Sequence, residues 1–143
     1  MGQLSKKKNT VFYIDGENIR YKKADIIMNV AKRQGILFSN RVYGIQKDNS
    51  TRGWTDRARE YGIADIRLFG GPEKNKVDRK IQKDAIEEIT QHKNVDIVCM
   101  ATSDKGYVET IRKLRAQGKR VVVIGEDKAP NELRNACNKF IEI

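Results

Sequence analysis

The stretch VFYIDGEN, residues 11–18, joins a short apolar run to an abrupt acidic end. Four consecutive hydrophobic residues followed by a turn signal predict a buried strand. Asp15, Glu17 and Asn18 then follow at the carboxyl end of that strand. The sequence therefore places carboxylates at one edge of a sheet, and the rest of the chain indicates which kind of sheet this is.

Apolar runs alternate with amphipathic stretches along the remaining sequence. Strands are expected at residues 11–14, 36–45 with an interruption at Ser39-Asn40, 63–69, 95–101, 120–124 and 140–143. Helical periodicity is expected at residues 18–34, 51–61, 77–92, 107–117 and 131–138. This alternation predicts one α/β domain over residues 10–143, with a mostly parallel central sheet in a three-layer arrangement. Residues 1–9 are expected to form a basic, flexible tail.

Charge and cysteine content limit the class of protein. The 143 residues include 29 Lys+Arg and 19 Asp+Glu, and a net charge of +10 favours nucleic acid or an anionic surface as partner. Cys99 and Cys137 lack CxxC spacing and His92 is the single histidine, which argues against a zinc site. No secretory h-region precedes the first strand, so a cytoplasmic protein is expected.

The amino terminus fits the short N-myristoylation pattern at Gly2 and Ser5, followed by three lysines. Lipidation with a basic cluster would anchor the chain to a membrane. We expect instead a basic tail that touches phosphates or has no role, and no stable membrane association.

Two further aspartates occupy positions comparable to that of Asp15. Asp104 follows the strand expected at residues 95–101, and Asp78 lies in the first turn of a helix, within its apolar arc. A carboxylate there is costly unless it binds backbone N–H groups or a cation. Each aspartate alone is explained by a turn or a helix cap. Jointly they predict one functional site, because an open parallel sheet binds ligands at the carboxyl ends of its strands.

Such a cluster suits phosphodiester hydrolysis assisted by Mg²⁺ or Mn²⁺, which carboxylate oxygens and waters hold. Asn18 is expected to orient a water or a phosphate oxygen, and Thr102 or Ser103 to donate a hydrogen bond to one. Supporting positions beside the site or at its rim are assigned to Asp84, Glu17, Thr102 and Ser103.

The chain resembles the NYN domains, PIN-like ribonucleases that include LabA-type bacterial proteins. The resemblance spans nearly the whole chain and is carried by residues 14–18 (IDGEN), 76–78 (KVD) with Asp84, 102–104 (TSD) with Tyr107, and 113–121 (KLRAQGKRV). It implies a PIN-like, Rossmannoid fold. It also implies that Asp15, Asp78 and Asp104 bind divalent metal for RNA cleavage, with Asn18 as a further catalytic residue.

Two positions depart from the family pattern. Gly106 stands where a second aspartate usually follows Asp104, and Asn138 replaces an acid near the carboxyl terminus. The site therefore either binds one ion through three carboxylates, or the protein keeps the fold and its RNA contacts without turnover. The second case is the non-enzymatic alternative, a module that binds RNA or recruits a partner.

Contacts to RNA, expected to be single-stranded, are assigned to cations near the acidic residues. Trp54 and Tyr21 are expected either to stack an unpaired base or to pack in the core. The assigned RNA-binding residues are Arg20, Lys22, Lys23, Arg52, Trp54, Arg57, Lys74 and Lys76. A homo-oligomer or a protein partner stays open.

Three other α/β families fit less well. A haloacid-dehalogenase-type phosphohydrolase needs a second acid two residues after the first, and Glu17 is a poor match without a cap insertion. A receiver domain needs a lysine where this chain has Gly125-Glu126. A dinucleotide-binding domain fails because residues 15–18 offer one glycine and two acids where pyrophosphate would lie.

Overall fold

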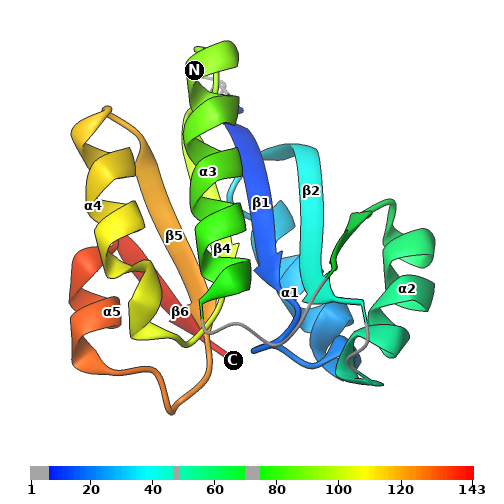
Figure 1. The fold of residues 1–143 in the computed structure, drawn as a ribbon. Coiled ribbons are helices and arrows are strands. Elements are labelled where there is room, and N and C mark those ends of the chain that lie inside the picture. Colours follow the sequence, from blue (N-terminus) through cyan, green and yellow to red (C-terminus); the bar gives the residue numbers. More distant parts are fainter. Residues whose placement is uncertain (1–6, 47–48, 70–74) are drawn as a thin grey trace.

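The computed structural model describes residues 7–46, 49–69 and 75–143, which form a parallel sheet flanked by helices (Figure 1). The strands are β1 (Asn9–Asp15), β2 (Ile36–Ile45), β3 (Ala64–Leu68), β4 (Ile97–Ala101), β5 (Arg120–Gly125) and β6 (Lys139–Glu142). Their order across the sheet is β3-β2-β1-β4-β5-β6, and every neighbouring pair is parallel. The predicted α/β class with a mostly parallel sheet is confirmed.

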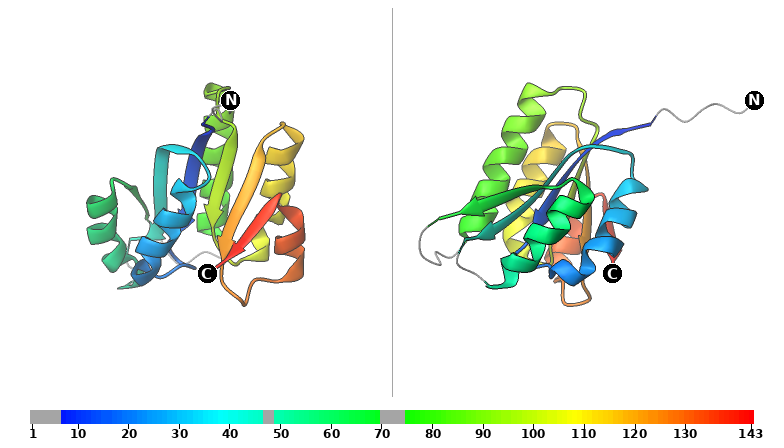
Figure 2. Two further views of the ribbon diagram at one scale, coloured as in Figure 1. Left: turned by 180° about the vertical axis from the view of Figure 1, so that it is seen from behind. Right: turned by 90° about the vertical axis from the view of Figure 1, so that its right-hand side faces the viewer.

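Helices cover both faces of the sheet and complete the three layers (Figure 2). They are α1 (Ala24–Lys32), α2 (Asn49–Tyr61), α3 (Lys76–Gln91), α4 (Val108–Ala116) and α5 (Asn131–Ala136), with 3₁₀ turns at Tyr21–Lys23 and Lys105–Tyr107. One apolar core lies under α3, α4 and α5, and the other under α1 and α2. None of the helices in the described ranges is long and apolar enough to cross a membrane.

Strand β1 shows why its sequence is apolar throughout. Val11 and Tyr13 belong to the core under α3 and α4, whereas Phe12 and Ile14 belong to the core under α1 and α2. Successive side chains of a strand point to opposite faces, so a central strand covered on both sides needs an uninterrupted hydrophobic run.

Three predicted boundaries differ from the structure. Strand β2 is continuous, and the expected interruption is a register shift of its pairing with β1, between Thr10 and Val11. The first helix begins later than Asn18, because the backbone N–H groups of Asn18 and Ile19 donate to the carbonyl of Asp15 in a turn. The last helix ends at Ala136, before Asn138, whose side chain accepts a hydrogen bond from the backbone of Val121 in β5.

The strand order reverses direction at β1. The chain moves from β1 outward through β2 to β3, and then crosses to β4 on the other side of β1. The loops that leave β1 and β4 therefore diverge, which leaves a crevice at the carboxyl ends of these strands. This end of the sheet is the lower one in Figure 1.

Candidate active site

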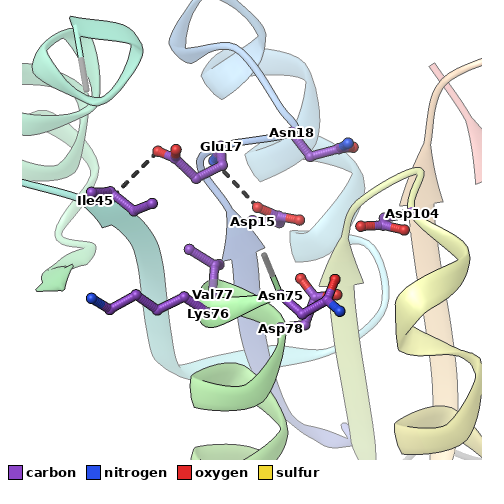
Figure 3. A pocket seen from close by; sticks show the side chains of 9 residues that line it. All are labelled: Asp15, Glu17, Asn18, Ile45, Asn75, Lys76, Val77, Asp78 and Asp104. Atoms are coloured by element: carbon purple, nitrogen blue, oxygen red, sulfur yellow. Dashed lines mark hydrogen bonds between the residues drawn. The ribbon is translucent and has the colours of Figure 1, made fainter. Parts of the chain in front are cut away.

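A cavity of about 270 Å³ lies at the carboxyl ends of β1 and β2, against the start of α3 (Figure 3). The lining residues are Asp15, Glu17, Asn18, Ile45, Asn75, Lys76, Val77, Asp78 and Asp104. The three aspartates predicted from the sequence thus line one cavity together with Glu17 and Asn18.

Asp15 forms the floor of the cavity and is 4% exposed. Its carboxylate accepts hydrogen bonds from the hydroxyls of Tyr107 (3.1 Å) and Thr102 (3.3 Å) and from the backbone N–H of Glu17 (3.2 Å). Burial raises the pKa of Asp15 to about 6, and the charge of Asp78 adds to the shift, while the Tyr107 and Glu17 hydrogen bonds oppose it. The hydrogen bonds therefore hold the carboxylate in place, while burial disfavours its ionised form.

Gly16 makes the turn after Asp15 possible. Its backbone N–H donates to the carbonyl of Tyr43 at 2.8 Å, and a Cβ at Gly16 would lie 2.6 Å from that same oxygen. Only glycine allows β2 to approach this closely. The sharp turn leaves Glu17 on the cavity wall, where its carboxylate accepts from the backbone N–H of Ile45 at 3.3 Å.

Asp78 and Asp104 face Asp15 from two other elements. Asp78 is half-buried in the first turn of α3, and Asp104 caps the 3₁₀ turn before α4 by accepting from the backbone N–H of Gly106 at 2.9 Å. Burial and the nearby charge of Asp104 raise the pKa of Asp78. The three carboxylates therefore repel one another within the cavity.

The loops after β1, β4 and β5 are joined by two hydrogen bonds. The side-chain oxygen of Asn18 accepts from the backbone N–H of Ser103 at 2.8 Å, and the hydroxyl of Ser103 accepts from the backbone N–H of Glu126 at 2.8 Å. Thr102 bridges Asp15 and the backbone N–H of Asp104. Thr102 thus contacts two of the acidic residues, and Ser103 holds Asn18 in place.

Tyr107 was not singled out as a site residue from the sequence. It is 1% exposed, and its hydroxyl donates to Asp15. Burial and the charge of Asp15 raise its pKa well above the ordinary value, so it stays a donor. Its spacing of three residues from Asp104, at the start of a helix, was the available signal, but an aromatic residue there is equally expected in the core.

The donors in the cavity fit a divalent cation by their chemistry, since carboxylate and amide oxygens are the ligands that Mg²⁺ and Mn²⁺ prefer. A cation would also offset the repulsion that raises the pKa of Asp15 and Asp78. Within the described ranges, however, no three acidic, histidine or cysteine side chains are grouped closely enough to hold an ion as they stand. The predicted spacing of the three carboxylates around one ion stays a prediction.

Gly106 lies against the site, although it has no side chain to contribute. A Cβ at this position would lie 2.4 Å from Oδ2 of Asp78 and 3.4 Å from Oδ1 of Asp104. The Asp78 carboxylate thus occupies the space that a side chain at position 106 would need. Asn138, the second departure from the family pattern, does not line the cavity and instead binds β5.

Of the two roles left open for Trp54, core packing is confirmed, and Asp84 does not lie at the rim of the cavity. Trp54 is 1% exposed and its indole N–H donates to the carbonyl of Ile19 at 2.8 Å, so it packs in the core and cannot stack a base. Asp84 does not line the cavity; it accepts from the hydroxyl of Tyr43 at 2.7 Å and pairs with Lys80 at 3.1 Å. Both side chains stabilise the sheet's contacts with its helices.

The predicted RNA-binding cations are distributed unevenly around the site. Lys76 lines the cavity, but its ammonium donates to the carbonyl of Phe69 and is turned away from the aspartates (Figure 3). Arg20 and Lys23 line an adjoining hollow that shares Asn18, where Lys23 pairs with Glu126 at 2.6 Å.

The other assigned cations lie elsewhere. Lys22 is exposed, and Arg57 pairs with Glu60 at 2.8 Å on the surface of α2. Lys74 and the side chain of Arg52 lie outside the described residues.

Comparison with known proteins places this chain clearly. The model of the NYN domain family matches residues 9–143. Among solved structures, a protein of unknown function from Vibrio parahaemolyticus superposes with a TM-score of 0.81 at 21% identity, covering 99% of this chain and 96% of that one. This likeness shows a shared fold. No curated protein matches the chain.

Proposed function

Because the chain belongs to the NYN domain family, whose members are PIN-like nucleases, we propose that it is a divalent-metal-dependent ribonuclease. The observation that supports this most directly is that Asp15, Asp78 and Asp104 line one cavity at the carboxyl ends of parallel strands. The substrate is RNA, in its single-stranded form, and the compartment is the cytoplasm, where the buried free thiols of Cys99 and Cys137 stay reduced.

Asp15, Asp78 and Asp104 would hold Mg²⁺ or Mn²⁺, which when bound lowers the pKa of a water and neutralises charge on phosphate oxygens. The protein's own residues prepare this site before substrate arrives. Tyr107, Thr102 and the backbone of Glu17 fix the orientation of the Asp15 carboxylate. Asn18 lines the cavity and is held through its oxygen by Ser103, which leaves its amide N–H₂ group to donate to a phosphate oxygen.

The proposed reaction depends on the charge state of Asp15. A pKa of about 6 means that near-neutral conditions ionise this carboxylate without a wide margin. Ionisation is needed because a protonated carboxyl is a poor ligand for a hard cation. Activity should therefore rise with pH from about pH 5 to pH 7, and a bound cation would shift that rise to lower pH.

Gly106 supports one alternative function. Without a side chain at this position, the cavity lacks the additional carboxylate that the family pattern would supply. The alternative is an NYN module that binds RNA or recruits a partner without cleaving. The two functions differ in one observable, which is metal-dependent turnover.

Cleavage of labelled RNAs by the purified protein tests the proposal. Single-stranded and structured RNAs would be incubated with Mn²⁺, Mg²⁺ or EDTA, using wild type, Asp15→Asn and the control Asp56→Asn. Asp56 is exposed on α2, so the control makes the same chemical change away from the cavity. We expect wild type and the control to cleave, with Mn²⁺ at least as effective as Mg²⁺, because Mn²⁺ binds nitrogen and oxygen donors more tightly.

Asp15→Asn should lose at least about a hundredfold in rate, since it removes a charge that is needed in the transition state. Its affinity for RNA should stay equal or rise, because a negative charge facing phosphate is gone. Equal absence of cleavage by wild type and Asp15→Asn, both folded and bound to RNA in Mn²⁺, would assign the protein to the binding-module alternative.

A further inference from the structure

Positive charge is concentrated at the end of the sheet opposite the acidic cavity. Three hollows of about 520, 340 and 530 Å³ lie where the strands begin, at the upper end in Figure 1. Of the residues that the structure describes, nine lysines and arginines line them, against a single acid, Asp96. We call the three hollows the amino-end patch, and their cations include Lys32 and Arg33, Lys93 and Arg120, and Arg112 and Arg115.

The three hollows form one continuous surface. Lys8 belongs to the walls of the first and second, and Lys119 belongs to those of the second and third. The cations come from the segment that precedes β1, from α1 and α4, from the loops before β4 and β5, and from the first residue of β5. Residues far apart in the sequence are therefore gathered by the parallel topology alone.

These cations are not neutralised by neighbouring carboxylates. Across the ranges that the structure describes, none of the nine forms a salt bridge, whereas Lys23, Arg57 and Arg134 elsewhere each have an acidic partner. Lys119 donates to the carbonyls of Lys93 and Val95, which fixes its position without removing its charge. The one acid, Asp96, accepts from the backbone N–H of Asn9 at 2.9 Å.

Stabilisation of helix ends explains only part of this charge. Lys32 and Arg115 lie in the last turns of α1 and α4, where a cation complements the helix dipole. Lys7, Lys8 and Arg120 have no such role, because they precede β1 or lie in β5. A surface selected only for helix stability would not extend the charge across all three hollows.

We propose that the amino-end patch is a docking surface for the phosphate backbone of RNA, separate from the acidic cavity. Arginine is well suited to this task because its planar guanidinium binds phosphate through two hydrogen bonds, and four of the nine cations are arginines. The proposal rests on the proposed function only in naming RNA as the polyanion.

The distance between the two sites sets the size of RNA that contacts both. Strand β1 runs from Asn9 beside the patch to Asp15 in the cavity, which is about 20 Å along a strand. A short oligonucleotide at the cavity cannot reach the patch, whereas a longer or folded RNA wraps from one end of the sheet to the other.

The surface fits RNA better than a lipid bilayer. Peripheral membrane surfaces combine cations with exposed apolar side chains that enter the interface. Among the large hydrophobic residues that the described part of the chain exposes, Ile36 alone lines the hollows. The cations also line concave walls, which a flat anionic surface would contact poorly.

Charge reversal tests the proposal by RNA affinity in EDTA, where no metal-dependent cleavage occurs. The patch variant is Arg33→Glu/Lys93→Glu/Arg112→Glu, with one change in each hollow. The matched control, Arg59→Glu/Lys83→Glu/Lys128→Glu, changes net charge equally at exposed positions on α2, on α3 and in the loop after β5, none of which lines the patch. Binding of a labelled single-stranded RNA of about 30 nucleotides would be titrated at several salt concentrations.

We expect the patch variant to bind this RNA at least about tenfold more weakly, with a log-log salt slope lower by about two, since three phosphate contacts are lost. The control should change affinity less than about threefold. Equal weakening in both variants would show a diffuse effect of net charge and overturn the proposal, as would no weakening in either. Unchanged RNA binding with lost binding to phosphatidylserine vesicles would instead assign the patch to membranes.

Two further measurements distinguish loss of RNA binding from loss of folding, and failure of the docking surface from failure of the nuclease proposal. If the Glu substitutions lower the melting temperature, the same three positions changed to Gln, with a Gln control set, give the same comparison. Cleavage of an RNA of two nucleotides should be equal in wild type and the patch variant, because so short a strand cannot cover the roughly 20 Å between the two sites. Absence of cleavage in every variant, with RNA affinity lost only in the patch variant, would refute the nuclease and support the docking surface.

Discussion

The two ends of the parallel sheet carry opposite charge. Among the described residues, four acids and one lysine line a single cavity at the carboxyl ends of the strands, whereas nine cations and one acid line three hollows at the amino ends. A net charge of +10 conceals this separation. The comparison teaches that attraction to a polyanion and the chemistry performed on it need not share a surface.

The separation has an electrostatic reason. Phosphate is repelled by the three aspartates, so a cavity without a bound cation contributes little affinity for RNA. The cations of the amino-end patch, about 20 Å away, can supply that affinity. At this distance they do not form ion pairs with the aspartates. If the same cations lay beside Asp15, they would compete with a metal ion for its carboxylate.

The largest effect should come from removing one carboxylate from the acidic end. Asp104→Asn should reduce metal-dependent cleavage at least about a hundredfold, because an amide is a weaker ligand for a hard cation and carries no charge. Binding of long RNA should be unchanged, since the amino-end patch is intact. Rates in Mn²⁺ and affinities in EDTA would be measured together, and a parallel loss of both would contradict the division between the ends.

The second effect concerns the stability that Asp15 costs the protein. Its pKa is about 6 in the folded state and 3.8 as the reference value, so the folded state binds the proton more tightly. The contribution of Asp15 to the free energy of unfolding is therefore most favourable at low pH. It falls by about 2 to 3 kcal/mol as pH rises from about 4 to about 6.

Asp15→Asn should remove that contribution and be more stable than wild type at pH 7, but not at pH 4. Urea unfolding in EDTA at both pH values measures the difference. If the variant and wild type differ by the same free energy of unfolding at both pH values, the ionised Asp15 carboxylate does not destabilise the fold.

A third effect isolates the shape of the acidic end from its charge. Gly106→Ala adds a Cβ that would lie 2.4 Å from Oδ2 of Asp78, so that carboxylate must rotate away. Cleavage should fall about tenfold or more, since misplacing a ligand by an ångström costs on that scale. Gly106→Asp, which would add the family's missing acid, meets the same obstacle.

Gly62→Ala is the matched control for Gly106→Ala. Gly62 has φ +68° and open space around the added Cβ, so the change should cost about 1 kcal/mol of stability and leave cleavage intact. Retained cleavage in Gly106→Ala would show that Asp78 is not positioned by this contact.

The smallest effect concerns the polar contacts between the sheet and helix α3, which runs from one end of the sheet to the other. Tyr43→Phe removes the hydroxyl that donates to buried Asp84, which keeps Lys80 as a partner. We expect a loss of about 1 to 2 kcal/mol in the free energy of unfolding, with cleavage changed less than about threefold. A larger loss of cleavage than of stability would indicate that Tyr43 also positions Asp78 through α3.

Much of the fold followed from the order of apolar and amphipathic segments. The same order allowed Asp15 and Asp104 to be placed together, because parallel strands bring their carboxyl ends to one edge. Asp78 was predicted from its position in the first turn of α3, and the structure puts it in the same cavity. Its role as a metal ligand stays a prediction.

Other features depended on contacts that the sequence does not specify. Helical periodicity placed Asp84 beside an apolar stripe, but the sheet surface beneath it presents the hydroxyl of Tyr43, so Asp84 is buried there. Trp54 follows a basic segment and suggested stacking, yet its indole completes the core under α1 and α2. The amino-end patch was missed because its cations come from four separate segments of the sequence, which only the fold brings together.

The hydrogen bonds from Ser103 to Asn18 and from Glu126 to Ser103 have a thermodynamic consequence for the cavity. Three loops that follow three separate strands are already ordered relative to one another before a ligand arrives. Ligand binding therefore has little conformational entropy left to remove from these loops, and more of the interaction free energy becomes available as affinity. In this sense the acidic end is preorganised, even though its charges are not yet balanced.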